Sequence, residues 1–295
     1  MSSTEKTKGQ VDCDVKKITF RDDSHVNINI FKNGKDVSSG PVFLVLPALG
    51  VRAGFYQPLV FSMVTKGWHV VTMDWRGTGT SSVQVSRKAG FGFHELLTID
   101  LPGIVTEVKR LFPNSPAYLL GHSLGGQLAL LYASLIEQTF EGVVVLTGGS
   151  NYYKNLKLFY RTIRLFNYRL IQIVTMICGY FPGHRLGFAG KESKIMMKDW
   201  LQESLTGVYN VSNNDKDFER LLGLIEIPVF FITLFGDKYV TSKCAKKLSQ
   251  KLSNAEITKI ELDAADYNLP RFDHFNWRKT PDPIAEQIEK WLPQH

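Results

Sequence analysis

The pattern of apolar residues changes along the chain near residue 42. Before that point, apolar residues at positions 26, 28 and 30 alternate with polar ones, which predicts a half-buried antiparallel strand over residues 25–30 that pairs with residues 17–20. Beyond it, apolar residues form short continuous runs, as in strands that a parallel sheet buries on both faces. These runs cover residues 42–46, 69–73, 117–120, 143–146 and 229–233, and a last strand is expected at 257–262.

Helical patterns fill the intervals between these runs. They cover residues 56–66, 102–112, 124–138 and 283–292, and Asp100 is a candidate cap of the second helix. Strands that alternate with helices predict a mostly parallel, doubly wound α/β sheet, because each helix carries the chain back to the start of the next parallel strand.

The alternation stops between residues 150 and 226. This segment has no buried-strand signature and looks helical, and the sheet pattern resumes after it. We therefore expect a core made of residues 1–149 and 227–295, with a helical cap inserted at 150–226. Open parallel sheets bind ligands at the carboxyl ends of their strands, so a cap at that edge would roof the binding site.

A serine stands where the predicted sheet would expose it. The pattern Gly-x-Ser-x-Gly at residues 121–125 follows one expected strand and opens a helix. In this setting the pattern is typical of a nucleophile elbow, in which the glycines permit a strained turn that presents the hydroxyl of Ser123 at the sheet edge. The helix that begins there would direct the positive end of its dipole at a developing anion.

A nucleophilic serine needs a base and a carboxylate that orients the base, and on such a fold they follow in the order Ser, Asp, His. Asp237 lies in the loop after the strand at 229–233, and His274 lies in a loop after the last strand. Asp263 and Asp266 are the alternative carboxylates. The predicted catalytic residues are Ser123, Asp237 and His274.

Two backbone N–H groups are also needed to stabilise the oxyanion of an acyl-transfer intermediate. Leu124 supplies one, because it follows the nucleophile. The other comes from the loop after the strand at 42–46, where Pro47 has no N–H and either Ala48 or Leu49 must donate. Leu49 is favoured by its position.

These residues resemble the α/β-hydrolase superfamily over residues 42–292. The elbow around Ser123 and the loop Pro47-Ala48-Leu49-Gly50 look closest to predicted bacterial hydrolases near the serine aminopeptidase and monoacylglycerol lipase-like group. Residues 74–81 look like the Asp-x-Arg-Gly-x-Gly-x-Ser turn of that superfamily, which we interpret as structural. The chain departs from many relatives at Pro47-Ala48, where they have His-Gly. The resemblance implies an α/β-hydrolase fold.

The main hypothesis is a serine hydrolase that cleaves carboxylic esters or thioesters with an apolar acyl part through an acyl-enzyme. Its partner would be a small-molecule ester or acyl substrate, and the chemistry requires no metal ion or organic cofactor. Two alternatives stay open. One is an acyltransferase that uses the same triad, and the other is a non-catalytic ligand-binding protein on a hydrolase fold.

Charge adds one feature to this picture. The net charge of +7 is concentrated in residues 151–200, which hold nine basic and two acidic residues, whereas the remaining residues balance at 26 of each sign. On a helix, Lys154, Lys157, Arg161 and Arg164 would share one face opposite an apolar face. The apolar face would cover the active site, with the basic side chains in solvent, or the helix would contact anionic membrane lipid or guide an acidic acyl substrate. A nucleic-acid partner is not expected, because no binding module is present.

The remaining sequence features favour a cytoplasmic protein. The first ten residues are polar, and no apolar run reaches the roughly 18 residues of a membrane-spanning helix. The three cysteines are far apart and fit neither a disulfide framework nor a zinc-finger spacing.

Overall fold

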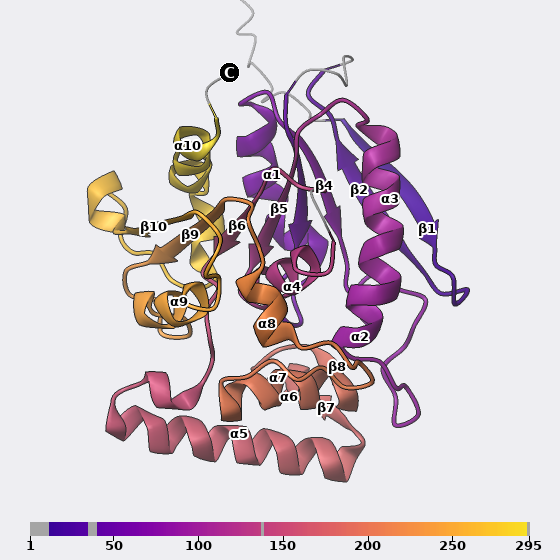
Figure 1. Ribbon diagram of the computed structural model, residues 1–295, viewed down its shortest axis with the longest axis vertical. Helices are drawn as coiled ribbons and strands as arrows, with labels where there is room; N and C mark the ends of the chain where they lie inside the picture. The colour runs from indigo at the N-terminus through magenta and orange to yellow at the C-terminus, as the bar shows by residue number, and fades with distance from the viewer. Residues whose placement is uncertain (1–11, 35–39, 137–138, 294–295) are drawn as a thin grey trace, which may run out of the picture.

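The computed structural model describes residues 12–34, 40–136 and 139–293, and its centre is an eight-stranded sheet (Figure 1). The strands lie in the order β1-β2-β4-β3-β5-β6-β9-β10. Their bounds are β1 Cys13–Thr19, β2 His25–Phe31, β3 Val42–Leu46, β4 His69–Met73, β5 Ala117–His122, β6 Gly142–Leu146, β9 Val229–Leu234 and β10 Ile257–Leu262. The strands β4, β3, β5, β6, β9 and β10 are parallel to one another. The strands β1 and β2 are antiparallel additions beside β4, at one edge of the sheet. The predicted fold class is confirmed.

The continuous apolar runs feed two cores, one on each face of the sheet. Successive residues of β3 point to opposite faces, so that Leu44 joins one apolar cluster and Phe43 and Val45 join the other. The first cluster is covered by α3 (Leu101–Leu111), α4 (Leu124–Ala133) and α9 (Ser242–Ser249). The second is covered by α1 (Gln57–Val64) and α10 (Asp282–Trp291). Helices on both faces explain why these strands have no polar side.

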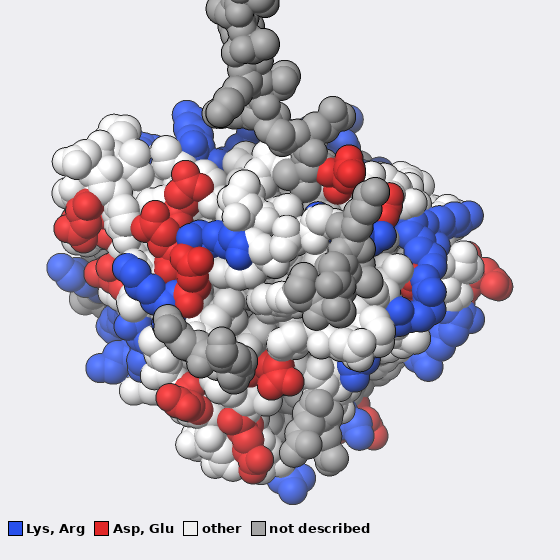
Figure 2. Space-filling view, turned by 90° about the horizontal axis from the view of Figure 1, so that it is seen from above, with Lys and Arg blue, Asp and Glu red and all other residues white. Residues whose placement is uncertain are grey.

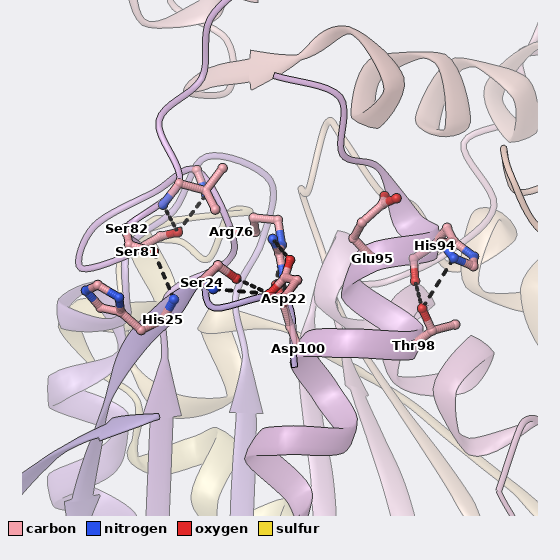
Figure 3. A network of polar contacts seen from close by, with 12 residues as sticks. Asp22, Ser24, His25, Arg76, Ser81, Ser82, His94, Glu95, Thr98 and Asp100 are labelled. Atoms are coloured by element: carbon pink, nitrogen blue, oxygen red, sulfur yellow. Dashed lines mark hydrogen bonds and ion pairs between the residues drawn. The ribbon is translucent and has the colours of Figure 1, made fainter. Parts of the chain in front are cut away.

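Asp100 does not cap α3, contrary to the sequence prediction. The short helix α2 (Phe93–Glu95) continues through a π-helical turn, Leu96–Asp100, into α3, so Asp100 is helical and its side chain makes no cap hydrogen bond. Its buried carboxylate instead accepts hydrogen bonds from Arg76, whose Nη1 also reaches Asp22 Oδ2 at 2.7 Å (Figure 3). Burial raises the pKa of Asp100 to about 6, against the opposing effect of Arg76.

The turn at residues 74–81 is also held by buried contacts of an acidic side chain. Asp74 Oδ1 accepts from the backbone N–H of Ala53 at 2.8 Å, and Asp74 Oδ2 accepts from that of Thr80 at 2.9 Å. Together with the Arg76 ion pairs, these bonds support the structural interpretation of this turn.

The segment between β6 and β9 leaves the sheet and lies beyond its end (Figure 1). Its elements are α5 Leu158–Cys178, β7 Tyr180–Pro182, α6 Gly183–Leu186, β8 Lys191–Ser193, α7 Lys194–Thr206 and α8 Phe218–Gly223. The strands β7 and β8 form a small antiparallel pair, which the helical pattern did not predict. The division into a core and a cap stays a prediction. None of the helices in the described residues is long and apolar enough to cross a membrane.

Helix α5 turns much of its apolar face to solvent, whereas the sequence pattern predicted that this face would cover the active site. Lys154 lies in a separate turn, Tyr153–Asn155, and Lys157 precedes the helix, so neither shares its face. Arg161 and Arg164 are half-buried and point at the protein, whereas apolar side chains of α5 are exposed. The interpretation of a basic outward face and an apolar inward face is therefore wrong.

Candidate active site

Ser123 occupies a strained turn between β5 and α4. Its φ of 54° and ψ of −115° lie outside the regions that L-residues favour. The turn requires glycine at 125, because a Cβ there would lie 2.0 Å from the carbonyl oxygen of Leu46. The Ser123 N–H donates to Leu146 O at 2.9 Å, which ties the turn to the neighbouring strand β6. The turn places the half-buried Ser123 at the carboxyl edge of the sheet, ahead of the N-terminus of α4.

The structure brings Ser123, His274 and Asp237 into one hydrogen-bonded line. His274 Nε2 lies 3.0 Å from Ser123 Oγ, and His274 Nδ1 lies 2.8 Å from Asp237 Oδ2. The carboxylate can only accept, so Nδ1 carries the proton and Nε2 is free to accept from the serine hydroxyl. Asp237 and His274 are 5% and 4% exposed, respectively, which shields their contact from water.

The backbone around Asp237 and His274 fixes their orientation. Asp237 Oδ1 accepts from the N–H groups of Tyr239 at 2.7 Å and Val240 at 3.1 Å, so its other oxygen faces His274. Neither alternative carboxylate is placed this way. Asp263 accepts from Ala265 N, within its own turn, and Asp266 is exposed.

The loop after β3 can offer a backbone donor to the site. The carbonyl of Pro47 accepts from Trp75 Nε1 at 2.7 Å, and the N–H of Ala48 donates to Tyr56 Oη at 2.8 Å. Within the described part of the chain, no hydrogen bond uses the N–H of Leu49 or that of Leu124. Because Ala48 is engaged, Leu49 stays the candidate oxyanion donor of this loop, beside Leu124 at the start of α4.

A buried hydrogen-bond chain, which sequence reasoning missed, links this loop to His274. Tyr56 Oη lies 2.9 Å from His122 Nδ1, and His122 Nε2 lies 3.0 Å from the carbonyl oxygen of His274. Complete burial lowers the pKa of His122 well below its usual value, and electrostatic repulsion from the nearby His274 lowers it further. His122 is therefore neutral. The His274 carbonyl can only accept, hence His122 Nε2 carries the proton and Tyr56 donates to Nδ1. His122 lies within the Gly-x-Ser-x-Gly pattern, but nothing in the sequence points to Tyr56 as its partner.

The segment inserted between β6 and β9 touches the same loop at Gly50. Its φ is 71°, and a Cβ at Gly50 would lie 2.0 Å from the backbone nitrogen of Gly190. Glu192 stands behind this contact, 2% exposed, and its Oε1 accepts from Gly190 N at 3.2 Å. Burial raises the pKa of Glu192 to about 7. The backbone that carries Leu49 is therefore packed between the sheet and the inserted segment.

A pocket of about 520 Å³ opens beside His274. Apolar and aromatic side chains form much of its wall, among them Phe235, Tyr239, Leu269 and Phe275. His274 and Tyr239, whose rings lie 5.1 Å apart, both line the pocket, whereas Ser123 is not among its lining residues. Such a wall suits an apolar group of a ligand.

Known proteins resemble this chain in sequence and in fold. A family model described as "Serine aminopeptidase, S33" matches residues 40–178. The protein named "Putative carbamate hydrolase RutD" from Serratia proteamaculans (strain 568) is 23% identical over 260 residues, which cover 82% of this chain and 91% of that protein. Lysophosphatidylserine lipase ABHD12 from Gallus gallus is 33% identical over 94 residues, which cover 31% of this chain but only 23% of the lipase.

The fold has solved counterparts. The structure of Est1E from Butyrivibrio proteoclasticus with ferulic acid superimposes with a TM-score of 0.62 at 12% identity, covering 94% of this chain and 98% of that one. The chain has the α/β-hydrolase fold, and its residues 40–178 match the serine aminopeptidase family model.

Proposed function

We propose that the protein is a serine hydrolase that cleaves carboxylic esters or thioesters with an apolar acyl part. The observation that carries the proposal is the line from Ser123 Oγ through His274 to Asp237, with contacts of 3.0 Å and 2.8 Å. A base that is oriented by a buried carboxylate and held against a strained serine is the arrangement that activates a hydroxyl as a nucleophile.

The reaction follows from the roles of these groups. Ser123 Oγ attacks the acyl carbon while His274 Nε2 takes the hydroxyl proton, and the N–H groups of Leu49 and Leu124 stabilise the oxyanion. His274 returns the proton to the leaving oxygen or sulfur, which departs and leaves an acyl-enzyme. Water, deprotonated by His274, then releases the acid and restores Ser123. Each oxyanion donor contributes roughly 10²–10³-fold in rate in comparable enzymes.

The substrate class is supported by the pocket beside His274, whose aromatic wall suits an apolar group. By their names, one relative hydrolyses a carbamate and another a lysophospholipid, and both reactions begin with attack on an acyl carbon. Of these two substrate classes, the apolar pocket wall favours an ester with an apolar acyl group.

Labelling with a serine-directed fluorophosphonate tests the nucleophile. The wild-type chain is expected to be labelled, Ser123→Ala is expected to remain unlabelled, and Asp237→Asn should be labelled roughly 10³–10⁴-fold more slowly, because the imidazole loses its orienting carboxylate. Ser134→Ala is the matched control, since that hydroxyl only donates to Leu131 O. A folded wild-type protein that is not labelled, or a Ser123→Ala variant that is labelled equally, would contradict the proposal.

A chain-length series of esters and thioesters defines the acyl group. We expect kcat/KM to rise with acyl length until the pocket is filled, with Ser123→Ala as the blank. Added alcohol or amine acceptors separate hydrolysis from acyl transfer: hydrolysis predicts that the acid is the main product. Saturable binding without turnover across the series would instead favour a ligand-binding protein.

A further inference from the structure

Helix α5 carries a continuous apolar stripe on its solvent-facing side. The stripe consists of six residues spaced by four and three positions, so that they align along the whole helix: Phe159, Ile163, Phe166, Leu170, Ile173 and Ile177. Phe159, Phe166 and Ile177 are 71%, 67% and 72% exposed. An apolar surface of this length is unusual on a protein that has no partner for it.

The exposure of this apolar stripe is built into the fold, because the opposite face of α5 is anchored. Tyr168 is 2% exposed, donates to the carbonyl of Asn151 at 2.8 Å and packs edge-on against Trp200 in α7. On the same face, Arg161 donates to Leu156 O at 2.7 Å, and Arg164 Nη2 lies 3.5 Å from Lys238 O. Rotating α5 to bury the apolar stripe would break all of these contacts.

The exposed charged side chains of the segment that carries the apolar stripe have one sign. Helix α5 contains no Asp or Glu, and the two acidic residues of the segment 151–200, Glu192 and Asp199, are only 2% and 3% exposed. The exposed charged residues of that segment are all basic: Lys154, Lys157, Arg169, Arg185, Lys191, Lys194 and Lys198. By contrast, the opposite end of the molecule, seen in Figure 2, shows Asp and Glu side by side with Lys and Arg.

We propose that α5 is an interfacial helix that docks the protein on a bilayer containing anionic phospholipid. The apolar stripe would enter the boundary between headgroups and acyl chains, and the basic side chains would lie among the phosphates. The helix is the outermost element at its end of the molecule (Figure 1), so a flat surface can contact the stripe along its roughly 30 Å length. A second copy of the chain is a poorer occupant, because it would bring two sets of basic side chains together.

Binding of the full-length protein to vesicles tests the proposal without reference to catalysis. Cosedimentation with phosphatidylcholine vesicles that contain phosphatidylglycerol should be stronger than with pure phosphatidylcholine vesicles, and it should weaken as salt is added. The double variant Phe166→Gln/Ile173→Gln should bind at least about tenfold more weakly, because transfer of even one such side chain from water gives a change of that size. The control variant Phe61→Gln/Val15→Gln removes two exposed apolar side chains that lie outside the inserted segment, and it should bind like the wild type.

The basic residues are tested by a matched pair of triple variants. Replacing Lys154, Lys157 and Arg169 by Gln should lower affinity for the anionic vesicles by about fivefold per residue. The control makes the same change in net charge at three exposed lysines outside the inserted segment, namely Lys17, Lys109 and Lys290. It should leave binding nearly unchanged.

Three results would overturn the proposal. The first is no binding of wild-type protein to the anionic vesicles. The second is binding that the Phe166→Gln/Ile173→Gln variant retains in full while its melting temperature shows that it is folded. The third is a wild-type dimer in sedimentation velocity that this variant converts to a monomer, because the apolar stripe would then be a contact between two copies.

Discussion

At the scale of single residues, three buried hydrogen bonds connect the two halves of the site. Ala48 donates to Tyr56, Tyr56 donates to His122, and His122 donates to the carbonyl of His274. The chain of bonds has a single direction, because its last member can only accept and His122 is neutral. The loop that carries Leu49 and the loop that carries His274 are thereby held in register, although they are far apart in sequence. We expect Tyr56 and His122 to act as positioning residues in this arrangement.

Tyr56→Phe tests this positioning. The substitution leaves the N–H of Ala48 and Nδ1 of His122 buried without partners, so the free energy of unfolding should fall by about 1–3 kcal/mol. We also expect kcat to fall more than KM changes, since both loops lose an anchor that matters most in the transition state. Denaturant unfolding and steady-state kinetics on a soluble ester measure the two effects.

The matched control is Tyr209→Phe. The Tyr209 hydroxyl is equally buried but has no hydrogen-bond partner within the described residues, so its removal should not destabilise the fold. A Tyr56→Phe variant as stable and as active as Tyr209→Phe would show that the hydrogen-bond chain has no positioning role.

At the scale of elements, the site depends on how the loop after β3 is packed. Gly50 lies against the backbone of Gly190 in the inserted segment, with no room for a side chain. The loop is held from the other side by Trp75 and Tyr56. The direction of the Leu49 N–H is therefore set jointly by the sheet and by the inserted segment.

Gly50→Ala should move this donor. The added Cβ would collide with Gly190 and would force a positive φ on an alanine, so we expect kcat to fall by roughly 10–10³-fold, up to the value of one lost oxyanion donor. Gly187→Ala is the control: its φ is 72°, and nothing lies within 4 Å of the added atom. If both variants lose activity equally, backbone strain alone explains the effect and Leu49 is not a donor.

Elements buried on both faces were the most predictable from sequence. The bounds of β3, β4 and β10 match the predicted ranges, although in β10, at the edge of the sheet, Lys259 and Glu261 are exposed and only Leu262 is buried. The prediction that Ser123, Asp237 and His274 would meet followed from strand order, because loops at the carboxyl ends of parallel strands share one edge. Their catalytic roles stay a prediction.

Two features could not be derived in this way: which face of α5 meets the protein, and that Asp100 pairs with Arg76 and does not cap α3. A helical pattern shows that a helix has two faces but not which of them meets the protein, and burial of apolar residues fails as a guide where the apolar face is exposed. Asp100 has the position of a cap, but its partner Arg76 is distant in sequence, and only the packed structure brings the two together. Contacts of this kind depend on tertiary structure, which local patterns do not encode.

At the scale of the whole molecule, several buried acids make stability depend on pH. Burial raises the pKa of Glu192 and of Glu203 to about 7, from an ordinary value of 4.5. Below pH 4.5 such a carboxyl is protonated in both the folded and the unfolded protein, and its contribution to stability is complete. As the pH rises towards 7, the unfolded chain ionises first, so stability is lost across this window and then levels off.

Glu192→Gln should flatten this dependence. Glutamine keeps the acceptor for Gly190 N–H but cannot ionise, so the fall in unfolding free energy between acid and mildly alkaline pH should shrink by on the order of 1–3 kcal/mol. Urea unfolding at a series of pH values measures it. Glu226→Gln, at an exposed glutamate, controls for the loss of one acidic residue. An equal flattening in that variant would rule out burial of Glu192 as the cause.

The pairing of β6 with β9 also bears on how such a protein can diversify. The chain departs from the sheet after Leu146 and re-enters at Val229, and these two points lie on neighbouring strands. A change in the length of the segment from α5 to α8 therefore need not shift the register of the strands that precede Ser123, Asp237 and His274. Evolution, or an engineer who builds chimeras, can therefore alter what reaches the nucleophile while leaving the nucleophile itself in place, provided that the new module still packs against Gly50.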